Sequence, residues 1–409
     1  MNKRIYPWVL VGLLSFNFGV VYFDRNALNF LMPLIQPELH LSNREVGLLA
    51  SALSLSWALS GLLVGRLSDL LRRRKIILVL AAVIFSAASV LSGWVSSFAM
   101  LCMARLLMGL AEGGVMPISQ ALVASEVEPG HRGLAMGVAQ NFGANLLGNF
   151  LGPLAVVSFA LSFGWRHAFY LAAVPGLIAA CLLQWLVREP PEEQLVQRHP
   201  AFTATSAAWR QRNVPVCVVM SILLVAFIVV FATFTPLYLV RVRGMDQSVM
   251  SWLMSMWGLT SMFFAFAVPG ASDRLGRKPI VISMSLIAAL VPLSVLLVDH
   301  MVWPLFVLFA LGAAASGVFP LVMATIPSET VPSQQLATVL GLTMGLGEIV
   351  GGVFSPAIAG WIADAHGLRS TLWIAVALSV TTSALGCFIQ ETAPQALRRR
   401  QVRSGLALG

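Results

Sequence analysis

The sequence predicts an all-α membrane protein whose twelve transmembrane helices form two similar six-helix bundles. Two observations lead to this prediction. Of the 409 residues, 58% are hydrophobic and only 11% are charged, whereas soluble domains are about 45–50% apolar and about 25% charged. The second half of the chain also repeats features of the first half at a nearly constant spacing. This composition leaves almost no room for a soluble catalytic domain.

The individual spans are runs of about 20 apolar residues, the length that an α-helix needs to cross the hydrocarbon core. The first run has no small-residue cleavage site, so we expect it to be an uncleaved span rather than a signal peptide. The twelve runs cover residues 7–32, 44–66, 76–96, 100–124, 133–160, 166–187, 214–240, 247–271, 279–298, 302–325, 336–362 and 370–390.

One long polar connection separates six spans from six. We expect an N-terminal bundle at residues 1–190, a cytosolic loop at 191–212, a C-terminal bundle at 213–392 and a basic tail at 393–409. The halves match at an offset of 203, where "GVMP" from Gly114 meets "GVFP" from Gly317 and Gly164 meets Gly367. A duplicated six-span unit predicts a binding site between the bundles, near the middle of the membrane.

The basic residues give the orientation. Of the 26 lysines and arginines, 19 fall on the side that holds both termini and five on the other side. Positive charge gathers on the cytoplasmic side of membrane proteins, so we expect both termini in the cytoplasm and the chain in the inner (plasma) membrane. The net charge of +9 then reflects the orientation of the chain in the membrane. We expect the lipid bilayer as a partner and no nucleic acid.

Five charges fall inside the spans: Asp24, Arg25, Arg105, Glu112 and Glu348. Adjacent residues do not share a helix face, so Asp24 and Arg25 are expected to have different partners. Glu112 follows Arg105 by seven residues, which places it two turns along the same face and about 10 Å deeper. Arginine keeps its charge and fits carboxylates, whereas a buried acid can take up a proton. The set therefore favours transport of an organic anion with protons. The alternative is that Asp24–Arg105 and Glu112–Arg25 are static pairs that hold helices together.

Polar residues in other spans are further candidates for substrate binding. Asn141, Asn145 and Asn149 recur every four residues and predict a polar stripe on one helix face, for hydroxyl groups of a solute or for neighbouring helices. Glu348 matches Asn145 at the offset of 203 and is expected to contact substrate, to bind a proton or to pair with a cation. The weaker candidates are Tyr22, Thr235 and Tyr238.

Other chemistry finds little support in the sequence. Trp57 is expected to pack rather than to bind substrate. The four cysteines lie in apolar runs without the spacing of metal ligands, and the histidines lie in loops or at span ends, so we expect no metal site and no histidine relay. An intramembrane enzyme would need a nucleophile with its base or a metal cluster within the spans, and the spans contain no Gly-x-Ser-x-Gly, no His-x-x-x-His and no clustered cysteines.

Two loop motifs resemble the signature of the major facilitator superfamily. The second copy, "PGASDRLGRK", matches from Asp273 to Lys278, and the first copy, "GRLSDLLRRRK", has Leu70 and Arg72 where the family has a basic residue and a glycine. The resemblance implies alternating access, with each motif aspartate capping a helix of the opposite bundle. The implied gating residues are Asp69, Arg73, Asp273 and Arg277.

"YFDR" at Tyr22–Arg25 and "RLLMGLAEGG" from Arg105 resemble the anion:cation symporter branch of that superfamily, which includes sugar-acid importers and the sialin and vesicular glutamate carriers. The resemblance implies that Arg25 faces substrate, that Asp24 and Glu112 bind protons, and that Arg105 switches between Glu112 and substrate. It also implies a monomer with no cofactor besides the coupled proton.

These observations predict a proton-coupled symporter that takes up an organic anion. A sugar acid such as a hexuronate or aldonate is the first expectation, because the asparagines offer partners to hydroxyl groups, and an aromatic carboxylate is the second. A drug/proton antiporter is the rival among carriers, although it would need no paired arginines. A nutrient sensor built on a carrier scaffold is the rival outside the carriers.

Overall fold

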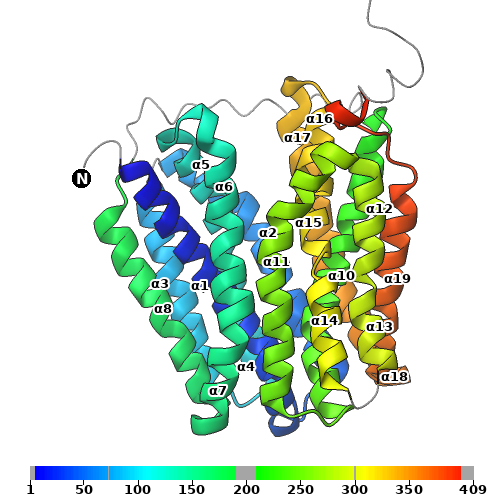
Figure 1. Ribbon diagram of the computed structural model, residues 1–409. Coiled ribbons are helices and arrows are strands. Elements are labelled where there is room, and N and C mark those ends of the chain that lie inside the picture. The colour runs from blue at the N-terminus through cyan, green and yellow to red at the C-terminus, as the bar shows by residue number, and fades with distance from the viewer. Residues whose placement is uncertain (1–4, 72, 190–208, 299–300, 398–409) are drawn as a thin grey trace, which may run out of the picture. The chain divides into compact units, whose positions relative to one another are not determined.

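The structure is a computed structural model that describes all residues except 1–4, 72, 190–208, 299–300 and 398–409 (Figure 1). Most of the predicted loop 191–212 and of the predicted tail 393–409 lies outside the described residues. The helices of the first half are α1 (Tyr6–Glu38), α2 (Asn43–Leu71), α3 (Arg74–Trp94), α4 (Phe98–Glu112), α5 (Val115–Glu126), η1 (Pro129–His131), α6 (Arg132–Gly137), η2 (Val138–Phe142), η3 (Ala144–Leu151), α7 (Gly152–Phe163) and α8 (Trp165–Leu186).

The second half repeats this succession of long helices. Its elements are α10 (Asn213–Arg241), α11 (Gln247–Leu275), α12 (Arg277–Ala288), α13 (Leu290–Leu297), α14 (Val302–Gly312), α15 (Ala315–Pro320), η6 (Leu321–Thr325), α16 (Ile326–Thr330), α17 (Ser333–Leu346), η7 (Gly347–Phe354), α18 (Ser355–His366) and α19 (Arg369–Gly386).

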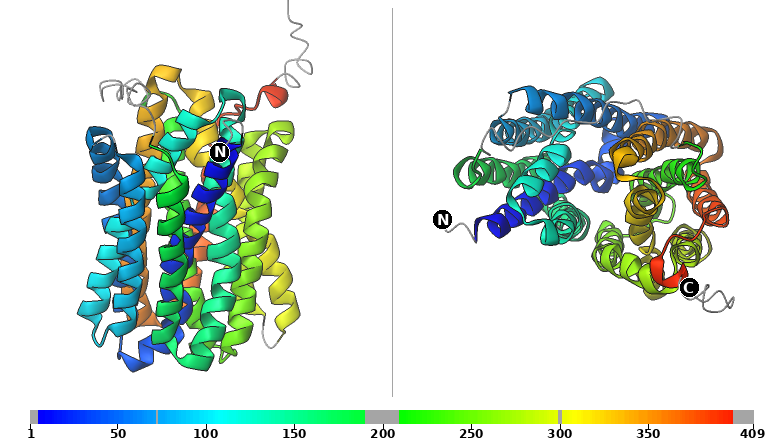
Figure 2. Two further views of the ribbon diagram at one scale, coloured as in Figure 1. Left: turned by 90° about the vertical axis from the view of Figure 1, so that its left-hand side faces the viewer. Right: turned by 90° about the horizontal axis from the view of Figure 1, so that it is seen from above.

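Contacts divide the chain into two compact units. Unit 1 holds residues 1–198, 232–259 and 356–368. Within it α3 packs against α8, α2 against α4, and α1 against η3 and α8 (Figure 2). The carboxylate of Asp364 accepts hydrogen bonds from the backbone N–H groups of Asn43 at 2.8 Å and Arg44 at 3.0 Å. These two bonds attach the segment 356–368 to the start of α2.

Glycine permits close helix contacts in unit 1. A Cβ on Gly143 would overlap the Ser15 carbonyl, and a Cβ on Gly19 would overlap the Gly143 carbonyl. The Ser15 hydroxyl uses this proximity, since it donates to the Val138 carbonyl at 2.9 Å and accepts from the Gly143 N–H at 3.0 Å. The α1 face that carries Ser15 and Gly19 is therefore fixed against η2 and η3.

Unit 2 holds residues 199–231, 260–355 and 369–409. In it α12 packs against α19 and α15, and α13 packs against α14 and α19. Its core combines Cys217, Met220 and Leu224 of α10 with Val318 of α15 and Leu321 of η6. As in unit 1, apolar side chains from several helices meet in the interior.

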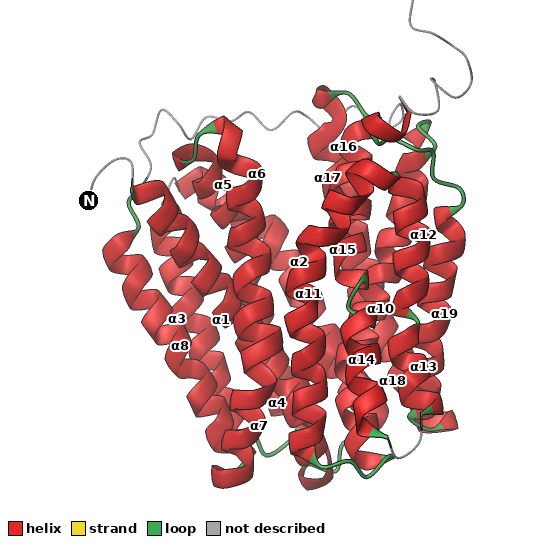
Figure 3. Ribbon diagram, in the orientation of Figure 1, coloured by secondary structure: helices red, strands yellow, loops and turns green. Residues whose placement is uncertain are grey.

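The described residues contain helices, turns and loops but no strand (Figure 3). Ten helices in this part of the chain are long and apolar enough to cross a membrane. They leave out α2 and α19, which occupy two of the predicted spans, so the number twelve stays a prediction. The elements η2, η3, η6 and η7 are π-helical turns within longer helices, a geometry that is frequent at functional sites.

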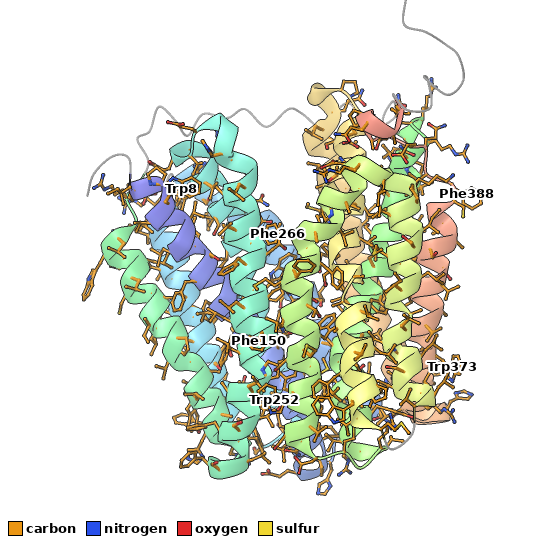
Figure 4. The ribbon with its side chains drawn as sticks, viewed as in Figure 1. Trp8, Phe150, Trp252, Phe266, Trp373 and Phe388 are labelled. Atoms are coloured by element: carbon orange, nitrogen blue, oxygen red, sulfur yellow. The ribbon has the colours of Figure 1, made fainter. Side chains whose placement is uncertain are left out.

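Large apolar side chains point outward from both units. Trp8, Trp252 and Trp373 are among the exposed aromatic residues, and Figure 4 shows them directed away from the helix axes. Trp303 and Trp185 are 82% and 79% exposed. A soluble monomer rarely exposes large contiguous apolar patches, whereas lipid tails accept such a surface. The exposed residues therefore agree with a multi-pass membrane protein.

The internal repeat is visible in the backbone. Gly164 and Gly367, which match at the offset of 203, have φ values of 88° and 82° and end α7 and α18. Gly276, the residue before α12, has a φ of 106°, whereas Arg73, the residue before α3, has a φ of −127°. A residue with a Cβ avoids positive φ. The residues that precede α12 and α3 therefore differ in backbone conformation, and Arg72, which stands at the glycine position of the first motif, lies outside the described residues.

Candidate functional site

The candidate site lies in unit 1, where α1, α3, α4 and α8 meet around Asp24. Asp24 is fully buried, and its Oδ1 accepts a hydrogen bond of 2.6 Å from the Ser89 hydroxyl of α3. Ser89 is also 3.1 Å from the carbonyl oxygen of Phe169 on α8. Oδ2 of Asp24 has no hydrogen-bond partner among the described residues. The carboxylate is thus held on one side and left open on the other.

Arg105 of α4 is buried beside Asp24, with 1% of its surface exposed. Its Nη2 donates to the Ser92 hydroxyl of α3 at 2.9 Å, and its guanidinium carbon lies 5.8 Å from the ring centroid of Phe169. Nε and Nη1 have no hydrogen-bond partner in the described part of the chain. The charges of Asp24 and Glu112 attract Arg105, but a serine and a ring fix its position.

Glu112 ends α4 and is fully buried, and neither carboxylate oxygen has a hydrogen-bond partner within the described ranges. The charges that act on it belong to Arg25, Asp24 and Arg105. Among the described residues, neither Asp24–Arg105 nor Glu112–Arg25 is a hydrogen-bonded ion pair. A static lock between helices would need such bonds to offset the cost of burying the charges.

Arg25 is half-buried and lies between two aromatic rings. Its guanidinium carbon is 5.6 Å from the Trp57 centroid of α2 and 5.9 Å from the Tyr22 centroid of α1. Asp24 and Arg25 therefore have different partners, as adjacent helix residues must. The sequence reasoning expected Trp57 only to pack, since only the fold brings α2 next to this part of α1. Among the described residues its contacts are these two ring faces, and the planar fork of a guanidinium suits a carboxylate.

The asparagines form a connected chain. The Asn145 side-chain N–H donates to the Asn141 carbonyl at 2.9 Å, and the Asn149 N–H donates to the Asn145 Oδ1 at 3.0 Å. Asn26 of α1 donates to the Asn149 Oδ1 at 2.8 Å. The stripe thus includes Asn26, which the sequence reasoning did not single out although it follows Arg25 directly. The bond between Asn26 and Asn149 joins α1 to η3 and so uses part of the hydrogen-bonding capacity of the stripe.

The remaining binding candidates fall in both units. Thr235 and Tyr238 of α10 are buried in unit 1, and the Thr235 hydroxyl has no hydrogen-bond partner among the described residues. Glu348 lies in the π-helical turn η7 of unit 2 and is half-buried. Its role beside Asn145 stays a prediction, because the two residues belong to different units.

The candidate gating residues of the two motifs differ in their contacts. The Asp69 side chain lies outside the described part, and Arg73 is exposed. Asp273 is 2.5 Å from Arg277, and Arg277 also donates to Glu329 from Nε at 3.2 Å and from Nη2 at 2.8 Å. Capping of a helix in the other bundle by Asp69 or Asp273 stays a prediction.

Glutamates that the sequence reasoning overlooked cap the helices after the two motifs. Glu391 accepts from the backbone N–H groups of Arg277 at 2.8 Å and Lys278 at 3.2 Å, at the start of α12. Glu189 binds the backbone N–H groups of Arg74 and Lys75 at the start of α3. A carboxylate at a helix N-terminus satisfies free N–H groups and the helix dipole. The two glutamates are 202 residues apart, close to the repeat offset of 203, and this near match was an available signal.

Comparison with known proteins agrees with this architecture. The family model described as Major Facilitator Superfamily matches residues 14–347 and 243–407. The hexuronate transporter of Bacillus subtilis (strain 168) is 28% identical over 392 residues, which cover 88% of this chain and 89% of that protein. A probable 4-methylmuconolactone transporter of Cupriavidus pinatubonensis is 28% identical over 343 residues, which cover 80% of this chain and 78% of that one.

Solved structures show the same fold. The crystal structure of a D-xylose-proton symporter has a TM-score of 0.76 with this chain at 20% identity, and the match covers 95% of this chain and 99% of that one. A bacterial homologue of the human lysosomal transporter Spinster has a TM-score of 0.73 at 18% identity, with 96% and 98% covered. At these identities the likeness concerns the fold alone.

Proposed function

The chain belongs to the Major Facilitator Superfamily, and from this premise we propose that it is a symporter that takes up an organic anion together with protons by alternating access. As a member of this family it is a multi-pass membrane transport protein and not an enzyme. The observation that carries the proposal is the group of buried charges around Asp24, in which two acids and two arginines meet without a hydrogen-bonded ion pair among the described residues.

Arg25 binds the carboxylate of the substrate in this proposal. Arg25 is less buried than Arg105, and its described contacts are the faces of Trp57 and Tyr22. Ring faces hold the guanidinium by cation–π attraction without using its N–H groups. Those groups can then form the paired hydrogen bonds that arginine makes to carboxylates.

Asp24 and Glu112 bind the coupled protons. Both are fully buried, and a buried carboxylic acid that lacks a bonded cation gains from taking up a proton. Arg105 keeps its charge whatever the two acids do, so it compensates whichever acid is ionised. Protonation and anion binding then support each other. When the acids are protonated, the positive charge of the arginines attracts the anion, and the bound anion in turn favours protonation of the acids.

A sugar acid is the substrate class that we favour. The chain Asn26–Asn149–Asn145 keeps donor and acceptor capacity for hydroxyl groups, and the half-buried Asn141 adds a further amide. A relative that covers most of the chain is a hexuronate transporter. An aromatic carboxylate is the second candidate, because Trp57 and Tyr22 beside Arg25 offer ring faces for stacking.

Uptake by proteoliposomes tests the proposal. Labelled glucuronate, gluconate and 4-hydroxybenzoate would be offered with and without an inward proton gradient, to wild type, Arg25→Ala and Glu112→Gln. We expect one class to accumulate only with the gradient, Arg25→Ala to abolish its binding, and Glu112→Gln to exchange substrate without accumulating it. Uptake that ignores the gradient, or normal transport by Arg25→Ala, would refute the symport mechanism and favour efflux of neutral or cationic compounds.

Two further measurements test the orientation and the oligomeric state. We propose that both termini face the cytoplasm and that the carrier works as a monomer. Labelling of a cysteine introduced near Leu397 should then require permeabilised cells, and molecular mass in detergent should correspond to one chain.

A further inference from the structure

The first turn of α2 is capped in part by its own residues and in part by a distant carboxylate. The Ser42 hydroxyl accepts from the Glu45 N–H at 3.2 Å, and the Glu45 carboxylate accepts from the Ser42 N–H at 2.8 Å. This is the reciprocal capping box of a helix start. The N–H groups of Asn43 and Arg44 lie outside the box, and Asp364 of α18 accepts from both, at 2.8 and 3.0 Å. The local cap thus leaves two donors to a residue from the second half of the sequence.

The backbones of α2 and α18 also touch beside these hydrogen bonds. A Cβ on Gly47 would overlap the Pro356 carbonyl, and a Cβ on Gly360 would overlap the Asn43 carbonyl. The contact residues recur every four positions, as Asn43 and Gly47 on α2 and as Pro356, Gly360 and Asp364 on α18. Four residues are about one helical turn, so each set lies on one face of its helix. We call this contact, in which the two helices run in opposite directions, the α2–α18 seam.

The internal repeat does not supply a second carboxylate of this kind. At the offset of 203, Asp364 corresponds to Leu161 and Asn43 corresponds to Asp246. The Asp246 carboxylate accepts from the Ser248 N–H at 2.7 Å, so α11 has a cap from its own chain segment. A leucine cannot replace Asp364 as an acceptor. The carboxylate bridge therefore belongs to α2 and α18 in particular and is not imposed by the duplicated fold.

The contacts of α2 with α4 are of a different kind. A Cβ on Gly113 of α4 would overlap the Trp57 carbonyl, and the Ser60 hydroxyl of α2 donates to the Leu110 carbonyl. Ser60 is 1% exposed, so water does not reach this bond. The bonds to Asp364 are exposed, and water can take its place at both N–H groups. Release of α18 therefore costs less than release of α4, and α2 stays with the first half when the seam parts.

We propose that Asp364 is a releasable latch, which holds the α2–α18 seam closed and leaves the N–H groups of Asn43 and Arg44 when the seam opens. This inference rests on the proposed function, because alternating access needs a contact at this end of the helices that forms and breaks. An exposed carboxylate at a helix N-terminus stabilises the closed state only modestly. Its loss therefore shifts the balance between closed and open carriers without fixing either state.

Thiol labelling of the purified full chain tests the latch. Ser51 follows Gly47 by one turn on α2, is 7% exposed, and donates to the Gly47 carbonyl at 3.0 Å. Ser51→Cys therefore reports opening of the seam to a water-soluble maleimide. Serine would replace the cysteines that are not buried, which are Cys102, Cys181 and Cys387. Labelling rates of this parent would be compared with those after Asp364→Asn and Asp364→Ala, in the absence of substrate.

Two controls separate release of the latch from a general loosening of the fold. Glu38→Gln removes a carboxylate at the end of α1, near the start of α2, but Glu38 accepts from Trp165 and Arg166 of the first half. Ser86→Cys, used in place of Ser51→Cys, puts the thiol at a position of α3 that is 1% exposed and lies outside the seam.

We expect Asp364→Ala to speed labelling of Ser51→Cys about fivefold, the factor that a carboxylate at a helix N-terminus contributes. Asp364→Asn should speed it about twofold, because the amide keeps one acceptor oxygen but no charge. Glu38→Gln should label like the parent, and Ser86→Cys should label slowly with or without Asp364→Ala.

Equal labelling of Ser51→Cys in the parent and in Asp364→Ala would overturn the latch. A parallel rise at Ser86→Cys would overturn it too, because the whole bundle would then have loosened. The uptake assay gives a separate answer, since labelling needs neither substrate nor a proton gradient. If wild type shows no gradient-driven uptake of the three anions, the symport mechanism fails, whatever the labelling rates are.

Discussion

The Ser89 hydroxyl on α3 donates a 2.6 Å hydrogen bond to Oδ1 of Asp24 on α1. Both groups are fully buried, and Ser89 also approaches the carbonyl of Phe169 on α8. One serine therefore connects three helices at the acid that we propose to bind a proton. It fixes one carboxylate oxygen, while the other has no hydrogen-bond partner among the described residues.

Ser89→Ala tests this connection. The substitution leaves Oδ1 of Asp24 without its donor, and a buried acceptor that loses its partner costs about 1–3 kcal/mol. We expect the free energy of unfolding to fall by that amount in denaturant titrations of the purified protein. Ser86→Ala, in the same helix, should cost less because its hydroxyl is bonded within its own helix. Equal losses in both variants would contradict the assignment.

Trp57→Leu tests the support of Arg25. A cation–π contact contributes about 0.5–2 kcal/mol, so we expect substrate affinity to fall about fivefold, while Trp57→Phe keeps a ring face and most of the affinity. Competition binding with the transported anion would measure this. Trp252→Leu is the control, because Trp252 is 55% exposed and points outward (Figure 4). An unchanged affinity in Trp57→Leu would remove Trp57 from the site.

The bond between Asn26 and Asn149 calls for a double-mutant cycle. Asn26→Leu, Asn149→Leu and the double variant would be compared by unfolding in detergent. Hydrogen bonds between transmembrane helices have coupling energies that average about 0.6 kcal/mol and reach about 1.7 kcal/mol. We expect a coupling in this range, because the two side chains are joined at 2.8 Å. If the losses in unfolding free energy of the two single variants simply add up in the double variant, the two side chains do not interact in the purified protein.

Glu391→Ala tests the cap of α12. The change removes the acceptor of two backbone N–H groups, and loss of an N-terminal cap costs about 0.5–2 kcal/mol. Glu189→Ala should have a similar effect at α3, because it holds the matching amides in the first repeat. Glu128→Ala provides an exposed control. Thermal unfolding would rank the three, and no difference from the control would argue against capping.

The charged core of the site was predictable because charges are rare inside apolar spans. Asp24, Arg105 and Glu112 stand out in the sequence for that reason, and the structure brings them together in one bundle. Isolated serines and tryptophans give no such contrast, and Asn26 lies outside the four-residue repeat of Asn141, Asn145 and Asn149 that marked the stripe. Ser89, Ser92 and Asn26 therefore became visible only through their contacts, and Trp57 was recognised as a neighbour of Arg25 only in the same way.

The sequence by itself determined the helices and the repeat. Helices in lipid satisfy their own backbone hydrogen bonds, so apolar runs of sufficient length specify them locally, and duplicated motifs need no tertiary contact to be recognised. The tertiary structure alone decided which side chains meet. Partners such as Ser89 and Asp24 are 65 residues apart, and packing between helices, which sets the distance between them, depends on the shapes of all the neighbouring residues at once.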